Sequence, residues 1–273
     1  MNTPSFTVSA INLFSVRSCA GEALQEAHVT PNGLTFDRQW RLVTPGGKFL
    51  TQRECPKMAL LHPSIADGRL QLRFAESPVA APPGQDNLDV ALVQISDSWR
   101  GIDQGEDVAT WLASVLGIEA RLLRVTPAAI DASSAGGVAP SDDPPVDFLR
   151  PDMAPVLVIS EESLADLNTR LDEPVPMNRF RPNIVVRGGL PYEEETWTRV
   201  VIGDVAYVAF HEPCGRCSMI NVDQAKGEKS GREPLKTLAG YRRTTAAVVF
   251  GKYMVPESSG CVRVGDTVSL AEG

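Results

Sequence analysis

The sequence predicts a β-rich α+β protein with a barrel-like architecture and few short helices. Three observations lead to this fold class. Strand-like segments outnumber helical ones, glycine- and proline-containing turn signals such as PNG at 31–33 and PGG at 45–47 separate these segments, and the segments do not follow a strand–helix–strand alternation. A doubly wound parallel sheet requires that alternation, whereas barrels and sandwiches are built from many short strands and tight turns.

The first third of the chain is predicted to form strands and one helix. Strand patterns occur at 5–16, within 27–52, and at 70–74, 89–96 and 120–125. The helix is predicted near 108–117, where apolar residues recur at helical spacing. These residues are Val108, Trp111, Leu112, Val115 and Leu116. Asp107 is suited to cap this helix and Gly117 to end it.

Residues 126–146 are rich in Ala, Ser, Gly, Pro and Asp and show no apolar period. Such a composition is typical of a flexible connection or a long surface loop. We therefore predict two domains, at 1–125 and 147–273, joined by a linker at 126–146.

The second part again alternates strands with short helices. A buried strand is predicted at 154–160, followed by a helix at 160–171 with Ser160 as its N-terminal cap. Further strands are predicted at 183–188, 198–210, 218–223, 244–255 and 261–270, and a short helix at 233–243 has Pro234 in its first turn.

Composition limits the classes of function. The 273 residues include 26 basic and 34 acidic ones, for a net charge of −8, so a general affinity for nucleic acid is not expected. The five cysteines are odd in number and scattered along the chain, so they do not indicate a secreted disulfide framework. Because the N-terminus lacks a signal-peptide pattern and no apolar run has membrane-spanning length, we predict a cytoplasmic protein that does not bind a membrane.

Cys214 and Cys217 form a Cys-x-x-Cys pair with Arg216 between them. Structural zinc requires four ligands, and the other cysteines and histidines are scattered singly. A redox disulfide of this spacing normally opens a helix in a βαβ unit, whereas residues 218–223 resemble a strand. A single thiolate bound to a transition metal, favoured by the neighbouring cation, remains open, as does the simpler interpretation of two small buried residues.

Arginines are the second group of candidate residues. Arg17, Arg38, Arg53, Arg179 and Arg181 could converge on an anion, because a guanidinium grips phosphate with two parallel donors. Each could equally pair with one of the many acids. In a strand, alternation would place Arg179 and Arg181 on the same face.

Asp152 and a run of three glutamates are the acidic candidates. Asp152, just before a predicted strand, suits either a turn or a proton relay at the mouth of a site. The run of glutamates at 193–195 is interpreted as a solvated loop.

Taken together, several stretches resemble the MOSC family, in particular its two-part members with an N-terminal β-barrel domain. That group includes the mitochondrial amidoxime reducing component and bacterial reductases of N-hydroxylated bases. The resemblance rests on stretches in the family's order: VRSCAGEAL, GLTFDRQW, FLTQRECPKMALL, DMAPVLVISEESLADLN, RFRPNIVV, PCGRCSMINVD and EPLKTLAGYRR. It implies a MOSC-type β-barrel packed against an N-terminal β-barrel domain.

The resemblance also implies a molybdenum cofactor and its ligands. Cys217 would bind the metal, leaving Cys214 as a bystander. The residues expected to hold the pterin and its phosphate are Arg17, Ser18, Arg38, Arg181 and Asn183. Asp152, Met153 and Ala154 would line the molybdenum pocket, with Asp152 as the catalytic candidate beside Cys217.

The function implied is reduction of N-oxygenated compounds: hydroxylamines, amidoximes and N-hydroxylated bases. Electrons would come from a separate protein, such as a ferredoxin, a flavoprotein reductase or a cytochrome. The alternative is a cofactor-binding or sulfur-carrying module in which Cys217 holds a persulfide.

Overall fold

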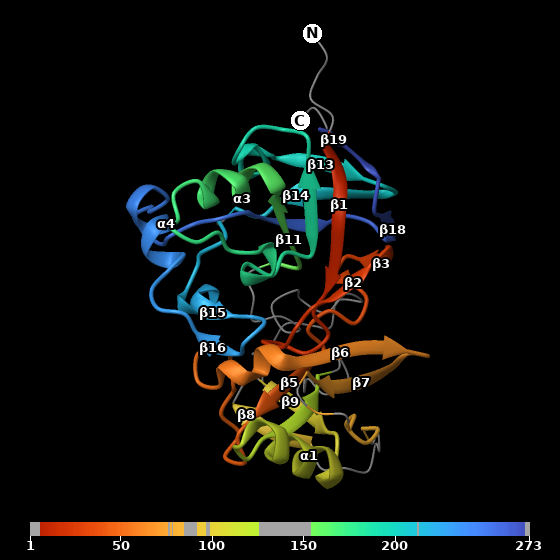
Figure 1. Ribbon diagram of the computed structural model, residues 1–273. Coiled ribbons are helices and arrows are strands. Elements are labelled where there is room, and N and C mark those ends of the chain that lie inside the picture. The colour runs from red at the N-terminus through yellow and green to blue at the C-terminus, as the bar shows by residue number, and fades with distance from the viewer. Residues whose placement is uncertain are drawn as a thin grey trace.

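The computed structural model describes residues 6–75, 77, 79–84, 92–96, 99–125, 154–211 and 213–270. The predicted linker at 126–146 lies outside these residues. The described elements form two bodies stacked one above the other (Figure 1). None of the described helices combines the length and the apolar composition of a membrane span.

The upper body is a closed ring of strands, which confirms the predicted barrel-like, β-rich fold. The ring closes because β1 pairs with both β19 and β12. Around the ring the described strands are β12 (Ile184–Arg187), β11 (Val156–Ser160), β17 (Lys252–Pro256), β14 (Val205–Ala209), β13 (Arg199–Ile202), β19 (Thr267–Leu270) and β1 (Phe6–Leu13). All adjacent pairs are antiparallel except β11 and β12.

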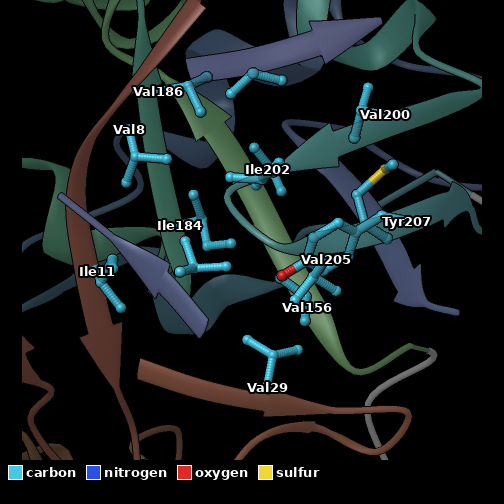
Figure 2. Close-up of a cluster of buried hydrophobic side chains, with 14 of the residues drawn as sticks. Val8, Ile11, Val29, Val156, Ile184, Val186, Val200, Ile202, Val205 and Tyr207 are labelled. Carbon is cyan, nitrogen blue, oxygen red and sulfur yellow. The ribbon is translucent and has the colours of Figure 1, made fainter. Parts of the chain in front are cut away.

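Alternation of side chains along the strands fills this ring. Val156 of β11 points into the barrel interior, where it joins Ile184, Ile202 and Tyr207 (Figure 2). Val158 belongs to the same core cluster. The intervening Leu157 and Ile159 pack outside the ring in another core cluster. β11 is buried along its whole length because successive side chains serve different cores.

The lower body has its own core. A sheet in the order β5 (Trp40–Val43), β10 (Arg121–Arg124), β9 (Trp99–Asp103) and β8 (Leu92–Ser96) is covered by α1 (Glu106–Leu116). The hairpin of β6 (Leu61–Ala66) and β7 (Arg69–Phe74) and the 3-10 turn η1 (Pro56–Leu60) complete it.

The remaining elements are short strands, helices and 3-10 turns. β2 (Glu22–Leu24) pairs antiparallel with the end of β1, and a small sheet is formed by β18 (Gly260–Arg263), β3 (Glu26–Thr30) and β4 (Gly33–Leu34). The helices beside the ring are α3 (Glu161–Asn168) and α4 (Leu235–Tyr241). The 3-10 turns are η4 (Met177–Arg179), η5 (Glu193–Thr196) and η6 (Ser218–Asn221), and β15 (Val222–Asp223) pairs with β16 (Glu228–Lys229).

Several local predictions can be compared with the structure. Ser160 caps α3 by accepting a hydrogen bond from Ser163 N, as expected. Gly117 ends α1 in a left-handed conformation, but Gly105 occupies its N-cap, so the prediction for Asp107 is wrong. Residues 218–223 begin as the turn η6 and become a strand only at Val222.

The interpretation of residues 193–195 as a solvated loop is also wrong for Glu194, which is fully buried. Its carboxylate accepts hydrogen bonds from Ser160 N at 3.1 Å and from the hydroxyls of Ser160 and Ser163 at 2.9 and 2.8 Å. Burial nevertheless raises the pKa of Glu194. This carboxylate ties η5 to the N-terminus of α3.

The domain limits remain a prediction. β1 is formed by residues 6–13, yet it lies in the ring with strands that follow residue 154. The chain therefore starts in the upper body, passes into the lower body, and returns.

Candidate functional site

A pocket of about 170 Å³ lies where the two bodies meet. Both contribute to its walls, since lining residues come from the stretches 17–53 and 157–253. The lining residues are Arg17, Ser18, Arg38, Thr51, Arg53, Leu157, Arg179, Phe180, Arg181, Gly215, Arg216, Cys217, Met219, Ile220 and Tyr253. Of the residues predicted from the sequence, the structure brings five to this pocket: Arg17, Ser18, Arg38, Arg181 and Cys217.

Unusual backbone geometry is concentrated at this pocket. Ser18, Arg38 and Arg181 have φ values of 62°, 54° and 57°, in the left-handed region. Non-glycine residues adopt this region only when the surrounding structure enforces it, and such strain tends to occur at functional sites. The fold thus holds two cations and a hydroxyl in a conformation that costs free energy.

Asn183 organises the residues behind the pocket. It is almost fully buried, and its Oδ1 accepts hydrogen bonds from Arg38 Nη1 at 3.1 Å and from Leu157 N at 3.2 Å. Its Nδ2 donates to Asp37 Oδ1 at 3.1 Å and to Asn12 O at 3.3 Å. Because the amide is engaged on both sides, Asn183 fixes Arg38 from behind and does not itself line the pocket.

Two of the cations contact the ring of Phe14. The guanidinium carbons of Arg38 and Arg181 lie 5.2 and 4.2 Å from the centre of its ring. Arg38 forms an ion pair with Asp37, and Arg181 donates to the carbonyl of Cys19. Stacking on an aromatic face and these polar contacts orient both guanidinium groups.

The two cysteines of the pair lie in different environments. Cys214 is 1% exposed and belongs to the core cluster that includes Phe180 and Phe250. Cys217 is exposed and lines the pocket. Arg216, between them in the sequence, is held by backbone carbonyls: its Nε donates to Phe250 O at 2.8 Å and its Nη1 to Phe180 O at 3.0 Å.

Two arginines of the pocket were among the candidate cations but lay outside the predicted site. Arg53 Nη1 lies 3.7 Å from Cys217 Sγ, so a residue of the first sixty contacts the thiol from across the junction. Arg179 is 6% exposed, donates to Ser230 Oγ at 2.8 Å, and lies 3.5 Å from a carboxylate oxygen of Asp223. Its Nε has no hydrogen-bond partner among the described residues, and burial lowers its pKa.

The signal that could have found both is their position inside the stretches FLTQRECPKMALL and RFRPNIVV, which carry the resemblance. Arg179 and Arg181 do line the same pocket, but strand alternation is not the reason. Arg179 ends η4, and Arg181 precedes the strand in a left-handed conformation.

Three predicted residues remain. Asp152 and Met153 lie outside the described residues. Ala154 is buried and is not one of the residues that line the pocket.

The pocket is strongly electropositive within an acidic protein. Six arginines line it, and among the described residues no aspartate or glutamate does. Converging guanidinium groups bind phosphate or another polyanion. A thiol beside them adds a soft donor for a transition metal. The arrangement therefore suits an anionic, phosphorylated ligand that carries such a metal.

Comparison with known proteins gives two family matches. Residues 5–119 match the MOSC N-terminal beta barrel domain and residues 145–269 match the MOSC domain. The chain is 33% identical to mitochondrial amidoxime reducing component 2 of Bos taurus over 285 residues, which cover 96% of this chain and 82% of that protein. It is 33% identical to mitochondrial amidoxime-reducing component 1 of Mus musculus, with 97% and 82% covered. The molybdenum cofactor sulfurase of Oryza sativa subsp. japonica is 32% identical over 89% of this chain but only 32% of its own length.

Proposed function

Since the chain belongs to the family of proteins that join a MOSC N-terminal beta barrel domain to a MOSC domain, we propose that it is a molybdenum-cofactor-dependent reductase of N-hydroxylated compounds. Its substrates would be hydroxylamines, amidoximes and N-hydroxylated bases. Two of the similar proteins are named for amidoxime reduction and match along nearly the whole chain. The observation that carries the proposal is the exposed Cys217 thiol in a pocket lined by arginines.

The residues present fit the cofactor in three respects. The guanidinium groups of Arg17, Arg38 and Arg181 offer donors for a phosphate, and the unpaired Nε of Arg179 is a further buried donor. Cys217 presents one sulfur atom on the same pocket. We assign Cys217 as the protein ligand of molybdenum and Cys214 as a residue of the core.

When bound, the cofactor would supply the two-electron redox chemistry that removes the oxygen of an N–hydroxyl group as water. The chain holds and orients it. Arg17, Ser18, Arg38 and Arg181 bind its phosphate and pterin, with Asn183 keeping Arg38 in place. Arg53 holds the sulfur of Cys217 through its N–H donor.

Two further parts of the proposal concern protons and electrons. Asp152 remains the residue predicted to move a proton, with Met153 and Ala154 beside it in the sequence. Electrons would come from a separate redox protein. The cytoplasmic location stays a prediction.

The test uses protein purified from a host that makes the cofactor. We expect near-stoichiometric molybdenum and pterin, and reduction of a model amidoxime to the amidine with dithionite-reduced methyl viologen as electron source. Cys217→Ser should abolish this activity, whereas Cys214→Ala should retain it with some loss of stability. Loaded protein that reduces no hydroxylamine, amidoxime or N-hydroxylated base would overturn the proposal.

The same preparation separates the alternative function. The alternative is a cofactor-binding or sulfur-carrying module in which Cys217 holds a persulfide. Peptide mass spectrometry would then show one additional sulfur on Cys217, whereas a cofactor-loaded protein would release a fluorescent pterin. No observation in the structure favours that alternative.

A further inference from the structure

The electron donor of the proposed reaction needs a docking surface, and the charge pattern near the pocket points to one. Residues 226–243 carry six basic and two acidic residues, whereas the whole chain has a net charge of −8. A basic stretch against such a background produces a local field of opposite sign to that of the rest of the protein.

The structure places this stretch beside the pocket. η6 and β15 follow Cys217 directly, and β16 and α4 come next along the same edge of the molecule (Figure 1). Asn221 binds both parts of the stretch: its carbonyl accepts from Ser230 N at 2.9 Å, and its Oδ1 accepts from Leu235 N at 3.2 Å.

Two more contacts extend the basic region to both sides of the Cys217 loop. The β15–β16 hairpin abuts η1, since a Cβ added at Gly227 would lie 3.2 Å from the Cα of Lys57. On the other side, Val248 and Val249 bridge to Arg243 and to Gly215, so Arg243 lies one chain segment away from the Cys217 loop.

Five cations of this region are exposed and form no ion pair among the described residues. We call them the basic rim: Lys57, Lys226, Lys229, Arg232 and Arg243. Within the part of the chain that the structure describes, none of them forms an ion pair within 4 Å. Their neighbours differ, because Lys236 lies 3.8 Å from Glu233 and Arg242 pairs with Glu195.

We propose that the basic rim is the docking surface for an acidic electron-carrier protein. This inference rests on the proposed function and names the partner's chemistry. Unpaired cations around a functional pocket steer an anionic protein to it and contribute more to encounter than to tight binding. Because Cys217 is exposed, a carrier docked on the rim brings its redox centre close to the pocket.

The test compares two variants with the same change in charge. The rim variant carries Lys226→Glu, Lys229→Glu and Arg232→Glu. The control variant carries Lys48→Glu, Arg69→Glu and Arg73→Glu, which are exposed positions in the lower body. The probe is a strongly acidic plant-type [2Fe–2S] ferredoxin, used oxidised in binding measurements and reduced in turnover.

We expect the wild-type protein to bind this ferredoxin at low ionic strength and to lose affinity as salt approaches physiological concentration. The rim variant should bind about tenfold more weakly or worse, while the control variant changes less than about twofold. The molybdenum content and the rates with two small donors of opposite charge, methyl viologen and dithionite, should be unchanged in both variants.

Three results would overturn the inference: no binding by the wild-type protein at low ionic strength, salt-independent binding, or equal weakening in both triple variants. Failure of the proposed function is distinguishable from these, because the rates with both small donors would then be absent in the wild-type protein as well.

Discussion

The substitution Asn183→Asp probes how the pocket is held together. It keeps the shape of the side chain and one oxygen that can accept from Leu157 N and Arg38 Nη1. The other end changes from a donor to an oxygen, which then faces Asp37 Oδ1 at 3.1 Å and Asn12 O at 3.3 Å. A favourable pair of contacts becomes repulsive without any change in volume.

The magnitude follows from those contacts. Two carboxylate oxygens 3.1 Å apart repel by about 5 kcal/mol at an effective dielectric constant of about 20, and the nearby Arg38 offsets part of this. Losing the two donated hydrogen bonds adds about 1–2 kcal/mol. We therefore expect the free energy of unfolding to fall by about 3–4 kcal/mol at neutral pH.

The pH dependence identifies the cause. The neighbouring Asp37 should raise the pKa of the introduced carboxyl in the folded state above its unfolded value. Stability is then present below the unfolded pKa and is lost as pH rises through the folded pKa, so acidification should recover part of the loss.

The assay is urea unfolding followed by the fluorescence of the buried Trp40 and Trp197, with Asn178→Asp as the control at an exposed position. The control should change stability by less than about 0.5 kcal/mol. Equal stability of Asn183→Asp and the wild-type protein at neutral pH would refute the assigned hydrogen bonds.

Three further predictions follow from individual side chains. Arg53→Gln should leave the unfolding free energy within about 0.5 kcal/mol of wild type but lower cofactor retention or reductase turnover about tenfold. Arg53→Lys should rescue part of this loss. Unchanged retention and turnover would contradict the contact of Arg53 with Cys217. Burial raises the pKa of Glu194, so wild-type stability should decline as pH rises above the group's ordinary value of 4.5, and Glu194→Gln should flatten that dependence in an unfolding series. Burial also raises the pKa of Cys19 to about 12, so iodoacetamide at pH 8 should alkylate the exposed Cys217 of cofactor-free protein well before Cys19, as peptide mass spectrometry can show.

Local patterns predicted much of the secondary structure. The helical spacing from Val108 to Leu116 gave α1, and Ser160 with its following acids gave the start of α3. These elements were predictable because capping and amphipathic periodicity act within a few residues. The closure of the ring was not, because β1 pairs with β12 across about 170 residues, and no local pattern encodes that pairing.

The candidate site likewise has a part that was predictable from the sequence and a part that was not. The family resemblance assigned Arg17, Arg38, Arg181 and Cys217 to one cofactor site, and in the structure all four line one pocket. The supporting contacts depend on tertiary packing. Arg53 reaches Cys217 only because the two bodies meet, and the guanidinium of Arg216 donates to the carbonyls of Phe250 and Phe180.

Glu194 shows why composition misleads at single positions. A run of three glutamates is usually solvated, since burying a carboxylate costs free energy unless donors surround it. Here Ser160 and Ser163 supply those donors from another element. The local sequence around Glu194 contains no sign of them.

X-ray absorption at the molybdenum K edge tests the central claim most directly, because it counts the sulfur atoms bound to the metal. The loaded wild-type protein is compared with Cys217→Ser and Cys214→Ser. We predict that Cys217→Ser has one sulfur ligand fewer and that Cys214→Ser matches the wild-type protein. A sulfur lost in Cys214→Ser, or in neither variant, would contradict the assignment of Cys217 as the metal ligand.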